Sequence, residues 1–193
     1  MKTDQRADEP RLLLRPHPAC PPLAVSAIAA RVLPVEGPWL RLRWRIDGAG
    51  RLVAPPFAGK GRADGLWRTT CFELFLRPAG GAGGYAEFNL SPSERWAAYD
   101  FDAPRMGMRE RAVPHGPVCT LRRGGSVAIF DAAIPLGALP AGDCAMGLSA
   151  VVEEAGDDGE AVLSYWALAH RGAVPDFHDP ACFTAALAAP AAR

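Results

Sequence analysis

The chain has 193 residues, 49% of them hydrophobic, and its 21 lysines and arginines balance 21 aspartates and glutamates. This composition is typical of a globular protein and excludes a disordered chain. Because no net charge attracts a polyanion, neither nucleic acid nor an anionic membrane is expected as a partner. The length suits one domain, placed at residues 11–193, after a polar segment 1–10 that we expect to be disordered.

The cysteines and the N-terminal segment predict a cytoplasmic protein. The five cysteines lie at positions 20, 71, 119, 144 and 182 without C-x-x-C spacing, which favours free thiols in a reducing compartment over a disulfide framework. The first 18 residues hold charges and prolines without an apolar core, so no signal peptide is expected. The sequence also lacks a run of about 18 apolar residues that could form a transmembrane helix.

The N-terminal part reads as short strands. Residues 12–14 suggest a short edge strand, and residues 23–35 fit a strand or a short helix, with valine and isoleucine favouring the strand. Residues 39–46 alternate between an apolar face and a face of three arginines, at positions 41, 43 and 45. This period of two predicts a half-buried strand. A solvated sheet face is the favoured reading of the arginine row, over a site for an anion or a sugar.

The central part predicts a hairpin with an unusual face. Residues 70–76 and 85–90 alternate as strands around a glycine-rich loop at 78–84, and their even positions are apolar. Their odd positions carry Cys71, Glu73, Phe75, Tyr85, Glu87 and Asn89. If the two strands pair, Glu73 lies opposite Glu87 or Asn89, depending on register. A third strand follows at residues 96–101, with its buried side undetermined.

The C-terminal part continues the pattern. Glycine and aspartate turns separate two further hairpins, at residues 118–133 and 146–169, and a last strand is expected at residues 183–187. About nine to eleven short strands without a long helical period predict an all-β fold. We expect an antiparallel β-sandwich of jelly-roll type.

The odd face of the central hairpin is the candidate site. Carboxylates and an amide bind adjacent hydroxyls, while an aromatic ring stacks on a sugar, so the face suits a small sugar. A surface face packed under a loop remains the alternative. Trp67 has the same parity as Glu73, but six extended residues span about 20 Å. Trp67 can therefore join this site only if its loop folds back.

The sequence leaves three other kinds of site open. Glu73 and Glu87 could act as the acid and base of a hydrolase or isomerase, although no known catalytic motif is present. A metal could be bound by histidines and aspartates at positions 170, 176, 178 and 179, whose spacing matches no known ligand pattern. A haem would need an axial pair such as Met106 or Met108 with His115 or His170.

Several motifs resemble those of DOMON-like proteins related to family 9 carbohydrate-binding modules. They are W-x5-E-x-F within residues 66–76, Y-x-E-F-N-L-S-P at 85–92, W-A-x-Y at 96–99, YWALAH at 165–170 and PDFH at 175–178. The resemblance implies a β-sandwich that binds a sugar or a haem without catalysis. It assigns sugar contacts to Trp67 and Glu73, with Asn89, Arg95 and Trp166 as further candidates.

The sequence thus predicts a non-catalytic module that binds a small sugar or glycoconjugate and uses no cofactor. The expected ligand-binding residues are Trp67, Glu73, Glu87, Asn89, Arg95 and Trp166. A haem- or metal-binding module and a small hydrolase or isomerase built on the two glutamates are the alternatives.

Overall fold

The structure is a computed structural model that describes residues 11–80 and 83–189; the segment 1–10, for which disorder was expected, lies outside these ranges. Short strands dominate it: β1 (Leu12–Pro16), β2 (Ala27–Glu36), β3 (Trp39–Asp47), β4 (Leu52–Val53), β5 (Gly61–Arg62), β6 (Cys71–Pro78), β7 (Tyr85–Leu90), β8 (Arg95–Phe101), β9 (Arg109–Glu110), β10 (Val118–Arg123), β11 (Val127–Pro135), β12 (Cys144–Ala155), β13 (Ala161–Ala167) and β14 (Ala185–Leu187).

Within the described ranges, the helical elements are four turns of 3-10 helix: η1 (Ala49–Arg51), η2 (Leu66–Arg68), η3 (Leu136–Ala138) and η4 (Pro180–Cys182). None of the helices in the described part of the chain has the length and apolarity needed to cross a membrane. Each predicted strand segment contains a strand, including residues 23–35, for which a short helix was the alternative and of which the part from Ala27 onward lies in β2.

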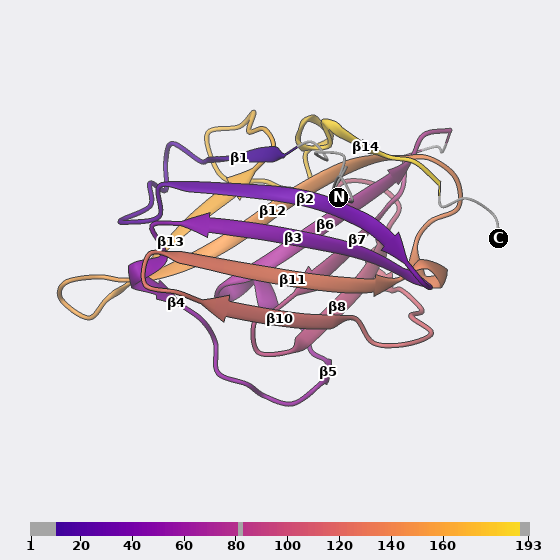
Figure 1. Ribbon diagram of the computed structural model, residues 1–193. Coiled ribbons are helices and arrows are strands. Elements are labelled where there is room, and N and C mark those ends of the chain that lie inside the picture. Colours follow the sequence, from indigo (N-terminus) through magenta and orange to yellow (C-terminus); the bar gives the residue numbers. More distant parts are fainter. Residues whose placement is uncertain (1–10, 81–82, 190–193) are drawn as a thin grey trace, which may run out of the picture.

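The strands form two layers that belong to one hydrogen-bonded path. In Figure 1, β10, β11, β3, β2 and β1 lie in front of β13, β12, β6, β7 and β8. Successive strands on this path pair antiparallel, except for the parallel pair of β5 with β8. The predicted all-β class is confirmed. The predicted antiparallel sandwich needs correction, because the layers are halves of one curled sheet with mixed pairing.

Strand β1 is the reason that the two layers are continuous. Its first half pairs with β2, where Leu14 lies opposite Ile28, and its second half pairs with β13, where Pro16 lies opposite Trp166. Residues 12–14 pair with β2 alone and so form an edge of the front layer, as predicted, while the next two residues pair with β13. A stretch of five residues can serve both layers because the chain crosses between them within its length.

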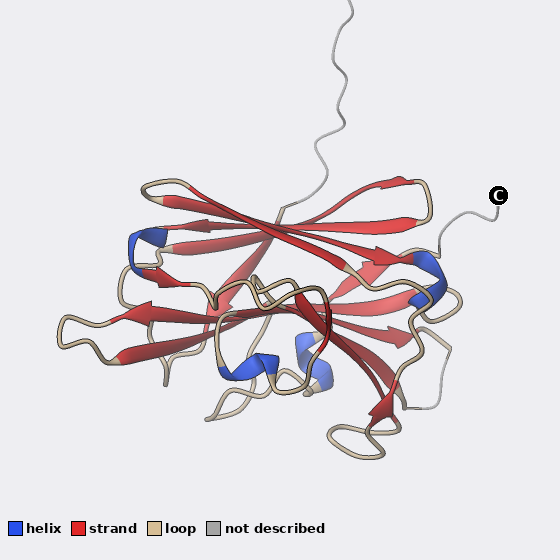
Figure 2. Ribbon diagram, turned by 90° about the horizontal axis from the view of Figure 1, so that it is seen from below, coloured by secondary structure: helices blue, strands red, loops and turns tan. Residues whose placement is uncertain are grey.

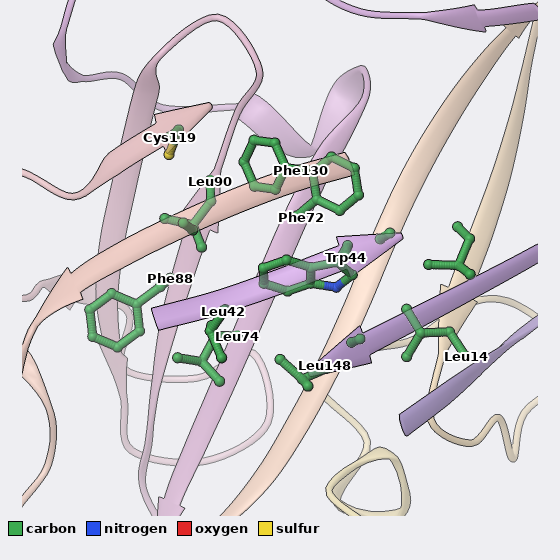
Figure 3. Packing of buried hydrophobic residues seen from close by; sticks show 14 of the residues in the cluster. Leu14, Leu42, Trp44, Phe72, Leu74, Phe88, Leu90, Cys119, Phe130 and Leu148 are labelled. Atoms are coloured by element: carbon green, nitrogen blue, oxygen red, sulfur yellow. The ribbon is translucent and has the colours of Figure 1, made fainter. Parts of the chain in front are cut away.

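The main core lies between the layers and is built from the apolar positions of the alternating strands. Phe72 of β6 stacks on Phe130 of β11 with ring centroids 4.1 Å apart, and both rings lie against Trp44 of β3 (Figure 3). All three side chains are fully buried. The even positions of β6 and β7 point into this core, as their alternation predicted.

The arginine row of β3 lies on the outer side of the front layer. Arg43 donates two hydrogen bonds to Asp131 of β11, at 2.6 and 3.0 Å. Arg41 pairs with Glu36, and Arg45 pairs with Asp47. Each arginine is satisfied by a neighbouring carboxylate, which supports the solvated-face reading over a binding site.

The outer side of the back layer is covered by long connections. Loops and short helical turns lie along this side (Figure 2). A second, smaller cluster of buried side chains fills this region, formed by odd positions of β6, β7 and β8 and by residues of the C-terminal connection. All five cysteines are free, and all but Cys20 are buried. This covered outer face, rather than the core, carries the polar residues that the sequence singled out.

Candidate functional site

A cavity of about 540 Å³ lies on the covered outer face of the back layer. Its volume is within the range of about 300–1,000 Å³ that is usual for small-molecule sites. Strands β6, β7, β8, β12 and β13 supply its floor, and three connections close over it. The lining residues are Trp67, Arg68, Glu73, Glu87, Tyr99, Phe101, Arg105, Met108, Val151, Leu163, Tyr165, Pro175, Phe177 and His178.

The floor of the cavity holds two carboxylates on neighbouring strands. The register places Glu73 opposite Asn89 and Glu87 opposite Phe75, which selects one of the two registers that the sequence left open. Glu73 and Glu87 are therefore diagonal neighbours on one face of the sheet, a relation in which side chains about 7–8 Å apart still influence one another.

Glu73 is a buried acid with one hydrogen-bond donor among the described residues. Its side chain is 3% exposed, and its Oε2 accepts from the Ser149 hydroxyl on β12 at 3.0 Å. Burial, and then the nearby charge of Glu87, raise the pKa of Glu73 to about 8. The carboxyl group is thus mainly protonated at neutral pH.

Glu87 is nearly as buried, at 4% exposure, and its Oε1 accepts from the Asn89 amide at 2.6 Å. Burial raises the pKa of Glu87 to about 7, against the lowering effects of Asn89 and Arg105. Within the described residues, its Oε2 is buried without a hydrogen-bond partner. The nearest basic atom to this oxygen is Nε2 of His178, at 3.8 Å, beyond hydrogen-bond distance.

His178 is held by a short chain of hydrogen bonds. Its Nδ1 lies 2.6 Å from the Tyr85 hydroxyl, which in turn accepts from the backbone N–H of Arg105 at 3.2 Å. A hydroxyl can donate one hydrogen bond and accept two, so this contact is compatible with either tautomer of the imidazole. Burial and the Arg105 charge lower the pKa of His178 to about 4, so the ring is neutral.

The walls are mainly aromatic. Trp67 lies in η2, which follows Gly65 at φ +72°, a left-handed conformation that glycine adopts without strain. This turn brings the Trp67 ring edge-on to Tyr99, with centroids 6.4 Å apart. At 38% exposure the indole keeps one side open. The loop thus folds back over the sheet, the condition under which Trp67 was expected to join the site.

Two arginines lie among the wall residues. Arg105, in the left-handed region at φ +59°, donates from Nε and Nη2 to Oδ1 of Asp176, at 3.2 and 2.8 Å. This bond ties the connection after β8 to the C-terminal connection above the cavity. Arg68 is the second arginine of the wall and follows Trp67 directly.

The structure brings together only part of the predicted set. Trp67, Glu73 and Glu87 line the cavity, whereas Asn89 lies behind Glu87, which it supports through its amide. Arg95 lies elsewhere and donates from its guanidinium to the Ala58 carbonyl, so its placement in the site was wrong.

Trp166 was also placed wrongly. It occupies an even position of β13 and points into the main core, where its Nε1 donates to Ser164 at 2.9 Å. Its neighbour Tyr165 lines the cavity instead. Parity along β13 could have separated the two residues, because successive side chains of a strand point to opposite faces.

Other cavity residues could not have been found from local patterns. Tyr99 was left undecided between two faces, and Phe177 and Arg105 belong to connections without a period. The sequence presents His178 as a candidate metal ligand and as the end of the PDFH motif, and neither reading predicts its place beside Glu87. The described residues contain no cluster of three or more histidine, cysteine or acidic side chains suited to a metal.

The haem alternative finds no axial pair at the cavity. Met108 lies in its wall, but His115 and His170 are not among the lining residues. His170 is within hydrogen-bond distance of the Arg15 carbonyl, 2.9 Å from its Nε2, and packs edge-on against His17. The methionine–histidine pairs that the sequence suggested are therefore not brought together there.

Comparison with known proteins gives a fold but no family. A scan of family models and a search of curated proteins yield no match. Among solved structures, a presumed carbohydrate-binding protein of Bacteroides uniformis ATCC 8492 is similar, with a TM-score of 0.57 and 18% identity over 93% of this chain and 86% of that one. At this identity the likeness shows a shared fold.

Proposed function

We propose that this protein is a non-catalytic module that binds a small sugar in the cavity above Glu73 and Glu87. The observation that carries the proposal is the combination of two buried carboxylates on the floor with aromatic rings on the walls. The fold shared with a presumed carbohydrate-binding protein supports it. The DOMON-like, jelly-roll relationship suggested by the sequence motifs belongs to the same proposal.

The cavity chemistry matches what a pyranose offers. A sugar ring presents hydroxyls at its edge and C–H groups on its faces. Glu73 and Glu87 bind the hydroxyls as acceptors, or as donors when protonated. The Trp67 and Tyr99 rings, set edge-on to each other, provide apolar surfaces against which a sugar face can pack.

Calorimetric titration with a panel of mono- and disaccharides tests this function. We expect saturable binding that Trp67→Ala and Glu73→Gln each weaken by about tenfold or more, because each removes a direct contact. Trp39→Ala serves as a control, since that half-buried tryptophan lies on the front layer. No binding by any sugar, or undiminished binding by both cavity variants, contradicts the proposal.

A second candidate, an acid–base enzyme, is favoured by one observation. Glu73 and Glu87 share the cavity, and their pKa values of about 8 and 7 suit a proton donor and a proton acceptor near neutral pH. Incubation of bound sugars and their aryl glycosides, followed by product analysis, distinguishes the two functions. Turnover that Glu73→Gln and Glu87→Gln abolish establishes the enzyme; binding without turnover rejects it.

A further inference from the structure

The two carboxylates of the cavity floor have no cationic partner within the part of the chain that the structure describes. Among the residues at 11–80 and 83–189, no lysine or arginine lies within ion-pair distance of Glu73 or Glu87. Arg105 is the arginine whose charge acts on both, and its Nε and Nη2 donate to Asp176. The neighbouring His178 is neutral. Buried carboxylates of this kind are rare unless a proton or a cation compensates them.

One oxygen of the cavity floor is left able to accept a hydrogen bond. Oε2 of Glu87 is buried, accepts no hydrogen bond from the described residues, and belongs to a residue that lines the cavity. The other oxygen is occupied by Asn89, which fixes the orientation of the carboxylate. Leaving such an acceptor unmatched is unfavourable, so a donor from the ligand at this position binds with a large advantage.

The surroundings favour an organic cation over a metal ion. A calcium ion takes six to eight oxygen ligands, whereas the cavity lining combines the two carboxylates with aromatic rings and with Arg68 and Arg105. The faces of tryptophan, tyrosine and phenylalanine attract ammonium groups, and the rings available here are Trp67, Tyr99, Phe101, Tyr165 and Phe177. Arg62 already lies over the Tyr99 ring, with its guanidinium carbon 4.8 Å from the ring centroid, so the other rings are the ones left for a ligand cation.

We propose that the cavity selects an amino sugar, whose protonated amine lies between Glu73 and Glu87 and donates to Oε2 of Glu87. This inference rests on the proposed sugar-binding function and names its ligand class. The ammonium group takes the place of the protons that the raised pKa values of the two acids retain near neutral pH. Binding is therefore coupled to proton release, because a nearby positive charge favours the ionised carboxylates.

Calorimetry with glucosamine, glucose and N-acetylglucosamine tests the inference, at a slightly acidic pH at which the amine is charged. We expect glucosamine to bind about 10- to 100-fold more tightly than the two neutral sugars, as a hydrogen bond between charged groups provides. Titration in two buffers of different ionisation enthalpy should show proton release with glucosamine alone.

Variants identify the group responsible. Glu87→Gln keeps the shape and an acceptor for Asn89, and should lower the affinity for glucosamine more than the affinity for the neutral sugars, so that the preference for the amine is lost. Glu73→Gln should likewise reduce the preference for glucosamine. With two variants, the test remains usable if one of them fails to fold. Glu160→Gln is the matched control, because Glu160 is exposed in the turn before β13, and it should bind as the unmodified protein does.

The outcomes separate this inference from the proposed function. Equal affinity for all three sugars, or an unchanged preference in both glutamate variants, overturns the amine assignment and leaves sugar binding in place. Binding of cyclohexylammonium and glucosamine without any neutral sugar supports the amine site and overturns a general sugar module. Stoichiometric calcium binding that Glu87→Gln abolishes overturns the inference in favour of a metal. Absence of all binding overturns both proposals.

Discussion

Glu154 shows how a buried charge can serve the fold instead of a ligand. It is fully buried, yet its two oxygens accept hydrogen bonds from the backbone N–H groups of Leu23, Ala24 and Val25, at 2.8–2.9 Å. These bonds fix the segment that enters β2. Glu87, by contrast, has one oxygen left without a partner among the described residues. The difference separates a structural carboxylate from one that can accept a ligand.

Replacement of Glu154 by alanine should therefore destabilise the protein strongly. The change leaves three backbone donors without their acceptor, and we expect a loss of about 3 kcal/mol or more in the free energy of unfolding. Urea unfolding measures it. Glu160→Ala, at an exposed position, should change stability by less than about 0.5 kcal/mol. Similar values for the two variants would contradict the role assigned to Glu154.

The cavity acids should make stability depend on pH in an unusual direction. Their pKa values in the folded chain, about 8 for Glu73 and about 7 for Glu87, lie above the ordinary value of 4.5, so the folded state holds more protons than the unfolded state between 4.5 and these values. Stability then falls as pH rises through this window. His178, with its pKa lowered to about 4 from 6.5, opposes the trend only below pH 6.5.

The fall of stability with rising pH should therefore be clearest between pH 6.5 and 8. Here the free energy of unfolding should decrease by up to about 1.4 kcal/mol per pH unit for each titrating acid. Chemical unfolding at several pH values measures the slope, and Glu73→Gln should reduce it because one titrating group is removed. A stability that rises with pH across this window, or a slope unaffected by Glu73→Gln, would show that the pKa of Glu73 is not raised in the folded chain.

At the level of elements, the turn after β3 depends on a close approach of two backbones. Gly48 has φ +79°, and a Cβ at this position would overlap the carbonyl oxygen of Ala24. Gly50, two residues on in η1, has ordinary space around it and no positive φ. Gly48 and Gly50 are thus matched positions in one connection, and only Gly48 requires glycine.

Gly48→Ala should lower the free energy of unfolding by about 1–3 kcal/mol, because it combines a strained φ with a backbone overlap. Gly50→Ala should be neutral or stabilise by up to about 1 kcal/mol, since alanine restricts the unfolded chain. Denaturant titration of both variants measures the difference. Equal effects at the two positions would mean that the turn relaxes to accept a side chain.

At the scale of the whole molecule, both layers share one core and one strand path. Phe72 of the back layer packs against Phe130 and Trp44 of the front layer, and β1 hydrogen-bonds to both layers. If either layer unfolded, the apolar side chains of the other layer in the shared core would be exposed to water. The layers should therefore unfold together, as expected for a single cooperative unit.

Thermal unfolding should accordingly show one transition that coincides by far-ultraviolet circular dichroism and by tryptophan fluorescence. Phe72→Ala should lower the free energy of unfolding by about 3–5 kcal/mol, because it opens a cavity between the layers, and should keep the transition single. Two separated transitions, or loss of one layer alone in the variant, would contradict a shared core.

Much of the fold could be predicted because it depends on local alternation. A strand has a side-chain period of two, so the apolar positions of β3, β6 and β7 and the polar odd face with Glu73 and Glu87 could be read directly from the chain. The all-β class and the paired arginine row follow from the same pattern. These are properties of neighbouring residues, which the amino-acid order specifies by itself.

The site was completed by contacts between residues far apart in the chain. Folding back of η2 places Trp67 on the odd face, and the connections after β8 and β13 bring Arg105 and His178 over it. Loops have no period, and their positions follow from the surfaces that they cover, so these contacts could not be predicted from local patterns. The curling of the sheet through β1 has the same origin, because strand pairing depends on tertiary packing as well as on propensity.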